Sequence, residues 1–303
     1  MKLQQLRYFV AVYEEGSVTS GATRAHATQS GLSMQIKDLE EQFGGPLFER
    51  SAKGVVPTEM GRRFYGYATQ ILRGVSEATQ AMKAMQGEIS GSVKAGLMPT
   101  FTRSVLPPAL IQFSDEYPLV QTSVLEAYSA QLTRDVVQGL LDFAVVPAPA
   151  SGEDTRIRYH LMGSDPEFLV SAPGGEHLTP VDLAKIGPLK LVLPGPDNAR
   201  RAKIDAYLQT HSIEVAAILE LDAMLGTLEL VAHSDWKTIL PGILCSADKG
   251  GEVRQLNPIV GGPSHVDYVM IEPKAASLSP AAQIFAEKLQ QELDRQLVWH
   301  QNI

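Results

Sequence analysis

The sequence predicts an α/β protein in three parts: a winged helix-turn-helix unit, a long linking helix and a C-terminal unit of two α/β lobes. Three observations support this prediction. Apolar residues recur at helical spacing through the first 43 residues, interrupted by short turns. An apolar heptad pattern without proline runs from Thr58 to about Gln86. From Ser92 onward, strand-like runs alternate with helical runs, as in α/β folds.

Length and composition restrict the class of protein. The chain has 303 residues, which suggests about two domains, and 44% of them are hydrophobic, enough for a core in each. Its single cysteine, Cys245, cannot form an internal disulfide, which fits a reducing compartment. There is no apolar run of about 18 residues and no signal-peptide pattern at the N-terminus. We therefore expect a cytoplasmic protein with no membrane partner.

The charge is divided unevenly along the chain. Residues 1–90 hold 10 Lys/Arg and 9 Asp/Glu, a net charge of +1, and residues 91–303 hold 16 and 25, a net charge of −9. Together they give the net charge of −8. The N-terminal third is not basic overall, so any binding of nucleic acid must depend on where its positive charges lie.

The first ninety residues predict a helix-turn-helix followed by a β-hairpin. Helices are expected over about 3–14, 18–25 and 29–43, with Ser17 and Thr28 as N-caps and Gly44 as the last stop. A small β-wing is expected around the Lys53-Gly54 turn. The helix pattern alone is equally compatible with a plain three-helix bundle and an ordinary hairpin.

The exposed face of the third helix favours binding to DNA. Short polar groups and an amide can reach base edges in the major groove, and helix N-termini accept phosphate. The wing supplies further cations. The candidate DNA-binding residues are Thr28, Gln29, Ser30, Ser33, Met34, Lys37, Arg50 and Lys53.

The same region resembles a known family in its sequence motifs. These motifs include Gly16-Ser17, the run Thr28-Gln29-Ser30-Gly31-Leu32-Ser33, the run Pro46-Leu47-Phe48-Glu49-Arg50 and the run Pro57-Thr58-Glu59-Met60-Gly61. Together they resemble the start of LysR-type transcriptional regulators over nearly all of residues 1–62. Two positions depart from the family pattern, since Ser30 replaces a usual proline and Met34 a usual arginine. Loss of that arginine removes one expected DNA contact and bears on the target sequence.

Residues 58–87 form the expected linker. Apolar residues spaced alternately by four and three define a seam over about three heptads. The seam comprises Phe64, Ala68, Ile71, Val75, Ala78, Met82 and Met85. A helix packed only on its own domain is the alternative. The resemblance implies dimerisation through this helix and favours a homotetramer, whereas the residues alone do not distinguish a dimer from a tetramer. Gly87 and Gly91 mark a hinge.

The C-terminal region, residues 92–303, predicts repeated strand and helix units of a doubly wound sheet. Pro99-Thr100-Phe101-Thr102 is expected to be a loop, and Thr179-Pro180 to begin a helix over 181–186. Two α/β lobes with a returning strand and helix resemble the periplasmic-binding-protein-like fold. The first lobe would hold about 92–162 and 270–303, and the second about 165–265, with two chain crossings between them.

In that fold a small molecule binds between the lobes, at strand C-termini and helix N-termini. Hydroxyls and helix amides there suit a small organic anion. The candidate effector-binding residues are Thr100, Phe101, Thr102, Tyr128, Ser129, Asp197, Asn198 and Trp236. Each could instead have an ordinary loop or capping role. The basic cluster Arg200-Arg201-Lys203 is interpreted as the solvated start of a helix, with a role in the cleft as the alternative.

No catalytic motif is present, and Cys245 is expected to be a buried small residue rather than a nucleophile. We therefore expect no enzyme activity, catalytic residue, cofactor or metal. The predicted function is a sequence-specific transcriptional regulator whose promoter activity responds to an effector. Its partners would be double-stranded promoter DNA, the effector, further copies of itself and RNA polymerase. A solute-binding protein or an enzyme on the same two-lobed fold is the alternative.

Overall fold

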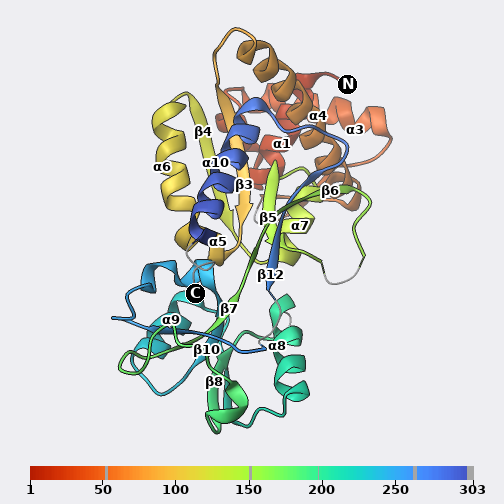
Figure 1. Ribbon diagram of the computed structural model, residues 1–303. Helices are drawn as coiled ribbons and strands as arrows, with labels where there is room; N and C mark the ends of the chain where they lie inside the picture. Colours follow the sequence, from red (N-terminus) through yellow and green to blue (C-terminus); the bar gives the residue numbers. More distant parts are fainter. Residues whose placement is uncertain (52–53, 150–151, 197, 262–264, 299–303) are drawn as a thin grey trace. The chain divides into compact units, whose positions relative to one another are not determined.

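The computed structural model describes residues 1–51, 54–149, 152–196, 198–261 and 265–298 (Figure 1). The chain separates into two compact units. The first is built on Met1–Glu88, and the second on Ile89–Val137 and Leu141–Ile303. This division near residue 88 separates the winged helix and linker from the two lobes.

The first unit contains four helices and a two-stranded hairpin. In chain order these are α1 (Leu3–Glu15), α2 (Val18–Arg24), α3 (Gln29–Phe43), β1 (Phe48–Ser51), β2 (Gly54–Pro57) and α4 (Glu59–Ala84). The hydroxyls of Ser17, Thr28 and Thr58 each cap the helix that follows. Strands β1 and β2 pair antiparallel as the wing. The buried side chains that join the helices are Leu6, Phe9, Val12, Leu32, Ile36, Leu39, Leu47 and Ala68.

Gly21 shows why a residue that weakens a helix stands inside α2. A Cβ atom at this position would lie 2.7 Å from Val12 Cγ2 and 2.9 Å from Val12 Cα in α1. Helices α1 and α2 therefore approach so closely that only glycine fits. The helical cost of glycine, about 1 kcal/mol relative to alanine, is offset by this close packing.

The first lobe of the second unit is a mixed five-stranded sheet in the order β4-β3-β5-β12-β6. Its strands are β3 (Gly91–Leu97), β4 (Val120–Glu126), β5 (Phe143–Pro147), β6 (Ile157–Asp165) and β12 (Val266–Pro273). Strand β3 pairs parallel with β4 and β5, whereas β12 pairs antiparallel with β5 and β6. The helices are α5 (Pro99–Ser104), α6 (Leu106–Glu116), α7 (Ser129–Val137) and α10 (Pro280–Leu297).

The first lobe corrects two expectations. Pro99–Thr102 belongs to helix α5 rather than a loop, because Pro99 occupies the first turn, where its missing N–H is not needed. Strand β6 was not predicted from the sequence. It is an edge strand with Arg158 and His160 on its exposed side, so it lacks the apolar run of a central strand.

The second lobe contains an antiparallel sheet in the order β10-β7-β11 and a parallel pair, β8-β9. Its elements are β7 (Glu167–Ser171), β8 (Leu189–Leu193), α8 (Ala199–Thr210), β9 (Val215–Glu220), α9 (Met224–Ala232), β10 (Thr238–Pro241), β11 (Gln255–Pro258) and two 3-10 helices, η1 (Leu183–Lys185) and η2 (Gly242–Asp248). The helix expected near 181–186 is only η1, capped by Asp182 rather than Thr179. Strand β11 and η2 were not predicted. The predicted parallel β-α-β pattern is therefore confirmed for β3, β4 and β5 and for β8 and β9, whereas β7 pairs antiparallel with β10 and β11.

The two lobes share a buried polar junction beside η2. Ile243 packs in the core of the first lobe, whereas Leu244 and Cys245 pack in the core of the second. The fully buried Asp165 carboxylate accepts hydrogen bonds from the Ile243 amide at 3.0 Å and the Tyr268 hydroxyl at 3.2 Å. Burial raises the pKa of Tyr268, and Asp165 reinforces the shift, so this hydroxyl stays protonated and donates.

Candidate DNA-binding face and effector cleft

Helix α3 presents the polar face expected to contact DNA. Thr28 caps the helix by accepting a hydrogen bond from the Gly31 amide at 3.2 Å. The opposite side of α3 is fixed in the core by Leu32, Ile36 and Leu39. This burial leaves the candidate contacts exposed, namely Gln29, Ser30, Ser33, Met34 and Lys37. Within the wing, the Arg50 backbone pairs with Val55; its side chain and all of Lys53 lie outside the described residues.

The linker helix α4 divides its apolar residues between two roles. Phe64 and Ala68, predicted for the seam between chains, pack instead in the core of their own unit. The Phe64 ring lies 4.8 Å from the rings of both Phe9 and Phe43, and Ala68 is fully buried. The remaining seam positions are exposed, namely Ile71, Val75, Ala78 and Met82 in the helix and Met85 just beyond it. An apolar stripe therefore begins at Ile71.

The second unit contains two adjoining cavities between its lobes. Chamber A has a volume of about 300 Å³ and receives side chains from α5, α7, α8 and the loop before α9. Chamber B has a volume of about 340 Å³ and lies toward α8 and the ends of β5 and β12. The two chambers share five lining residues, Ser129, Ala130, Pro147, Arg200 and Val266. The two chambers therefore lie side by side, and together they are called the cleft.

Chamber A collects hydrogen-bonding groups from both lobes. The polar residues that line it are Thr100, Tyr128, Ser129, Gln131, Arg134, Asn198, Arg200 and Asp222. The Tyr128 hydroxyl donates to the Asp222 backbone oxygen at 3.3 Å, and burial, followed by Asp222, raises the pKa of Tyr128. The Asp222 carboxylate accepts from the Gly195 amide at 3.0 Å. Asn198 caps α8 by accepting from the Arg200 amide at 3.0 Å.

The two arginines of chamber A differ in their partners. Arg200 is largely buried, and it donates to the Glu167 carboxylate at 2.8 Å and the Ile239 carbonyl at 2.8 Å. Arg134, on α7, is exposed and has no ion-pair or hydrogen-bond partner for its side chain within the part of the chain that the structure describes. Among the described residues, Arg134 is therefore the cation of this chamber that is free to bind an anion.

Three predicted effector contacts are corrected by the structure. Phe101 is fully buried in the first lobe, edge-on to Tyr268 at 5.1 Å between ring centroids. Thr102 donates to Glu126 and the Pro99 carbonyl and does not line the cleft. Trp236 packs against the core of the second lobe rather than at the cleft rim.

The structure brings Thr100, Tyr128, Ser129 and Asn198 together in chamber A, and Asp197 lies outside the described residues. Arg134, Gln131 and Asp222 were missed. Arg134 and Gln131 stand inside an amphipathic helix without a local motif, so the sequence carried no signal for them. Arg200 is not a solvated helix start, as interpreted, but the buried partner of Glu167.

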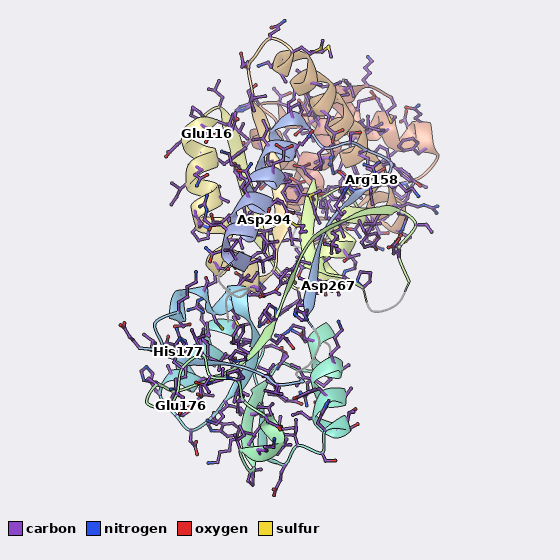
Figure 2. All side chains as sticks on the ribbon, in the orientation of Figure 1. Glu116, Arg158, Glu176, His177, Asp267 and Asp294 are labelled. Carbon is purple, nitrogen blue, oxygen red and sulfur yellow. The ribbon has the colours of Figure 1, made fainter. Side chains whose placement is uncertain are left out.

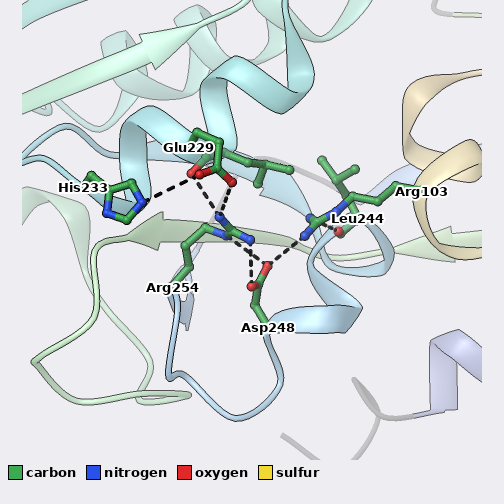
Figure 3. Close-up of polar contacts among 7 residues, drawn as sticks. Arg103, Glu229, His233, Leu244, Asp248 and Arg254 are labelled. Atoms are coloured by element: carbon green, nitrogen blue, oxygen red, sulfur yellow. Dashed lines mark hydrogen bonds and ion pairs between the residues drawn. The ribbon is translucent and has the colours of Figure 1, made fainter.

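A charged network anchors helix α5 (Figure 3). The same helix carries Thr100, which lines chamber A. Arg103 donates to the Leu244 carbonyl at 2.6 Å and lies 3.5 Å from the Asp248 carboxylate. Asp248 is buried and receives two hydrogen bonds from the equally buried Arg254, at 3.0 and 3.1 Å. Arg254 also donates to the Leu228 carbonyl of α9 at 3.1 Å. This network joins α5 of the first lobe to η2 and α9 of the second.

A winged helix-turn-helix unit followed by a two-lobed unit with cavities between its lobes is the domain composition of a DNA-binding regulator with a ligand-binding domain. Two protein-family models match the sequence. The family model described as bacterial regulatory helix-turn-helix protein, lysR family, matches residues 3–62, and the family model of the LysR substrate binding domain matches residues 86–294. The chain belongs to the LysR family of transcriptional regulators. Within the described residues, no helix is long and apolar enough to cross a membrane.

Individual relatives and structures agree with this assignment. The chain is 29% identical over 299 residues to the nitrogen assimilation regulatory protein nac of Klebsiella aerogenes, covering 95% of this chain and 94% of that protein. It is 33% identical over 190 residues to the regulator ShiR of Corynebacterium glutamicum, covering 61% of this chain and 62% of that protein. A full-length OxyR variant from Pseudomonas aeruginosa has the same fold, with a TM-score of 0.74, 18% identity and coverage of 96% and 95%. CbnR complexed with its target DNA has a TM-score of 0.62, 21% identity and coverage of 96% and 100%.

The thiol of Cys245 should be unreactive in the folded protein. It is fully buried, and burial, reinforced by Asp248, raises its pKa to about 12. Because the thiolate is the reactive form, we expect no labelling by a disulfide reagent at about pH 8, and complete labelling after denaturation. Mass spectrometry of the intact chain measures both states. Labelling of the native protein within minutes would contradict this burial.

Proposed function

We propose that this regulator binds promoter DNA through the exposed face of α3, with the wing holding the DNA backbone, and that a small organic anion in chamber A modulates its activity. The proposal of an anionic ligand rests mainly on Arg134, a cation without a partner among the described residues. Arg134 lines the same cavity as Thr100, Ser129 and Asn198. The exposed α4 stripe from Ile71 supports pairing of two chains, and the likeness to its family favours a tetramer. We place the protein in the cytoplasm, with RNA polymerase as a further partner.

Anion binding is favoured here by local contacts. The second unit has a net charge of −9, which by itself repels an anion. Screening weakens that field beyond about 8 Å at physiological salt, whereas hydrogen bonds act at about 3 Å. Ser129 and Ala130 line the same cavity at the N-terminus of α7, where the first amides of a helix lack intrahelical partners and add donors. Asp222 is the acidic side chain among the described residues that lines chamber A, and its carboxylate already accepts a hydrogen bond from the Gly195 amide. We infer that the local donors outweigh the negative charges of the unit.

The DNA-binding role is tested by Gln29→Ala. If Gln29 reads a base, the variant should lose about 1–3 kcal/mol of discrimination at one base position, because an amide can pair bidentately with adenine. Gel-shift titrations on the regulator's own upstream DNA and its single-base variants measure this loss. The matched control is Gln42→Ala, an exposed glutamine near the other end of α3. Equal weakening on specific and random DNA would refute base reading.

The effector role is tested by Arg134→Gln. Loss of a charge-assisted hydrogen bond is expected to weaken binding of a carboxylate ligand by about ten- to a hundredfold. Calorimetric titration with a screen of carboxylates, sulfonates and neutral sugars provides the measurement. Lys185→Gln is the control, since it removes one exposed cation of the same unit outside both chambers. A response to neutral compounds alone, unchanged in Arg134→Gln, would contradict the anion proposal.

A further inference from the structure

Chamber B has no role in the function proposed so far, yet it adjoins chamber A and shares Arg200 and Ser129 with it as lining residues. A small anion held at Arg134 in chamber A would leave chamber B empty. The two cavities have similar volumes, about 300 and 340 Å³. A ligand that fills both chambers must therefore place a second functional group in chamber B. The charged residues that line chamber B indicate whether this group is positive, negative or neutral.

Most charges that line chamber B are already paired. Glu167 receives hydrogen bonds from Arg200. Asp154 receives them from Arg156 at 2.9 and 2.6 Å, and this contact lowers the pKa of Asp154 to about 2. The exceptions are Asp267 and Lys203, whose side chains have no partner among the described residues.

Asp267 and Lys203 differ in how firmly they are placed. Both side chains are exposed, but Asp267 has a short side chain on β12, and Figure 2 shows it at the end of that strand that adjoins the second lobe. Lys203 is exposed on α8 and carries a long, flexible side chain whose ammonium can remain in water. Within the described part of the chain, the fixed unpaired charge of chamber B is therefore the negative carboxylate of Asp267.

Ion pairs cancel most of the formal charge along the cleft. Asp154 is paired with Arg156, and Glu167 is paired with Arg200, the cation that the two chambers share. Among the described residues, the cation without a partner in chamber A is Arg134, and the carboxylate without a partner in chamber B is Asp267. These two opposite charges, one in each chamber, would orient a dipolar ligand with its negative end in chamber A.

We propose that the effector is an amino carboxylate, with its carboxylate at Arg134 in chamber A and its ammonium group beside Asp267 in chamber B. This inference rests on the anion binding proposed above and specifies its chemical class. A zwitterion carries no net charge, so the net charge of −9 of this unit does not repel it. The ammonium would satisfy the carboxylate that the described residues leave without a partner.

The test compares three matched ligand series on the full-length protein by calorimetric titration. These are straight-chain monocarboxylates from butanoate to octanoate, their ω-amino derivatives and the corresponding dicarboxylates. At the best length, the ω-amino compound is expected to bind about tenfold more tightly than the monocarboxylate. Asp267→Asn should abolish that advantage and leave monocarboxylate binding within about twofold. Asp235→Asn, which removes an exposed charge outside both chambers, should leave the advantage intact.

The alternative outcomes separate the two proposals. Monocarboxylates could bind with an affinity that depends on Arg134, while the ω-amino group gives no gain in affinity. That result would overturn the ammonium site in chamber B and leave the anion site in chamber A supported. Tighter binding of dicarboxylates, lost in Lys203→Gln, would also overturn the ammonium assignment. If the protein binds no compound of any series, the proposed anion site fails, and the inference that rests on it fails too.

Discussion

Replacing Arg254 by leucine is expected to lower the free energy of unfolding of the C-terminal unit by about 3–5 kcal/mol, because the change leaves the buried Asp248 carboxylate without its main partner. Both side chains are at most 6% exposed, and Arg254 also satisfies the Leu228 carbonyl. The thermal midpoint should fall by about 10 °C or more. Trp236, which packs against the same core cluster as Leu228, reports the transition by fluorescence.

The matched control for this prediction is Arg156→Leu. Arg156 pairs with Asp154 at 2.6 Å, but its side chain is 67% exposed, so removing it should leave the thermal midpoint nearly unchanged. A similar fall of the thermal midpoint in Arg254→Leu and Arg156→Leu would contradict the prediction that the buried ion pair contributes more to stability than the exposed one. In Arg254→Leu we also expect weaker carboxylate binding, because Asp248 helps hold Arg103 and hence the helix that carries Thr100.

Ile71→Asp is expected to break the pairing of two chains through α4. Ile71, Val75 and Met82 are 38%, 36% and 59% exposed, so this apolar stripe is free to pack against a second chain. A carboxylate at Ile71 would then be buried without a partner, which should weaken self-association by at least about tenfold. Sedimentation should detect a smaller assembly, and binding to DNA with two half-sites should weaken in parallel.

Ser76→Asp provides the control for the linker helix. It places the same charge at an exposed position on another side of α4, where the seam does not run. Its mass in solution and its DNA affinity should stay close to those of the unchanged protein. An Ile71→Asp protein of unchanged mass would show that the stripe is not an interface.

The sequence was most informative where local patterns decide structure. Ser17 and Thr28 cap helices as local chemistry predicts, and the apolar spacing of α3 separated Leu32 and Ile36 from the exposed face. The heptad pattern was less decisive. It treats Phe64 and Ile71 alike, but only the folded unit shows that the first belongs to its own core.

In the C-terminal unit, the sequence by itself determined most of the alternation of strands and helices and several of the segments that border the cleft, because periodicity and turn residues act over a few positions. It thereby placed Thr100, Tyr128, Ser129 and Asn198 correctly at one cleft. Only the tertiary structure decided which charges remain unpaired. Arg134 and Asp267 are distant in the chain, and whether a charge has a partner depends on contacts between segments that no local pattern encodes.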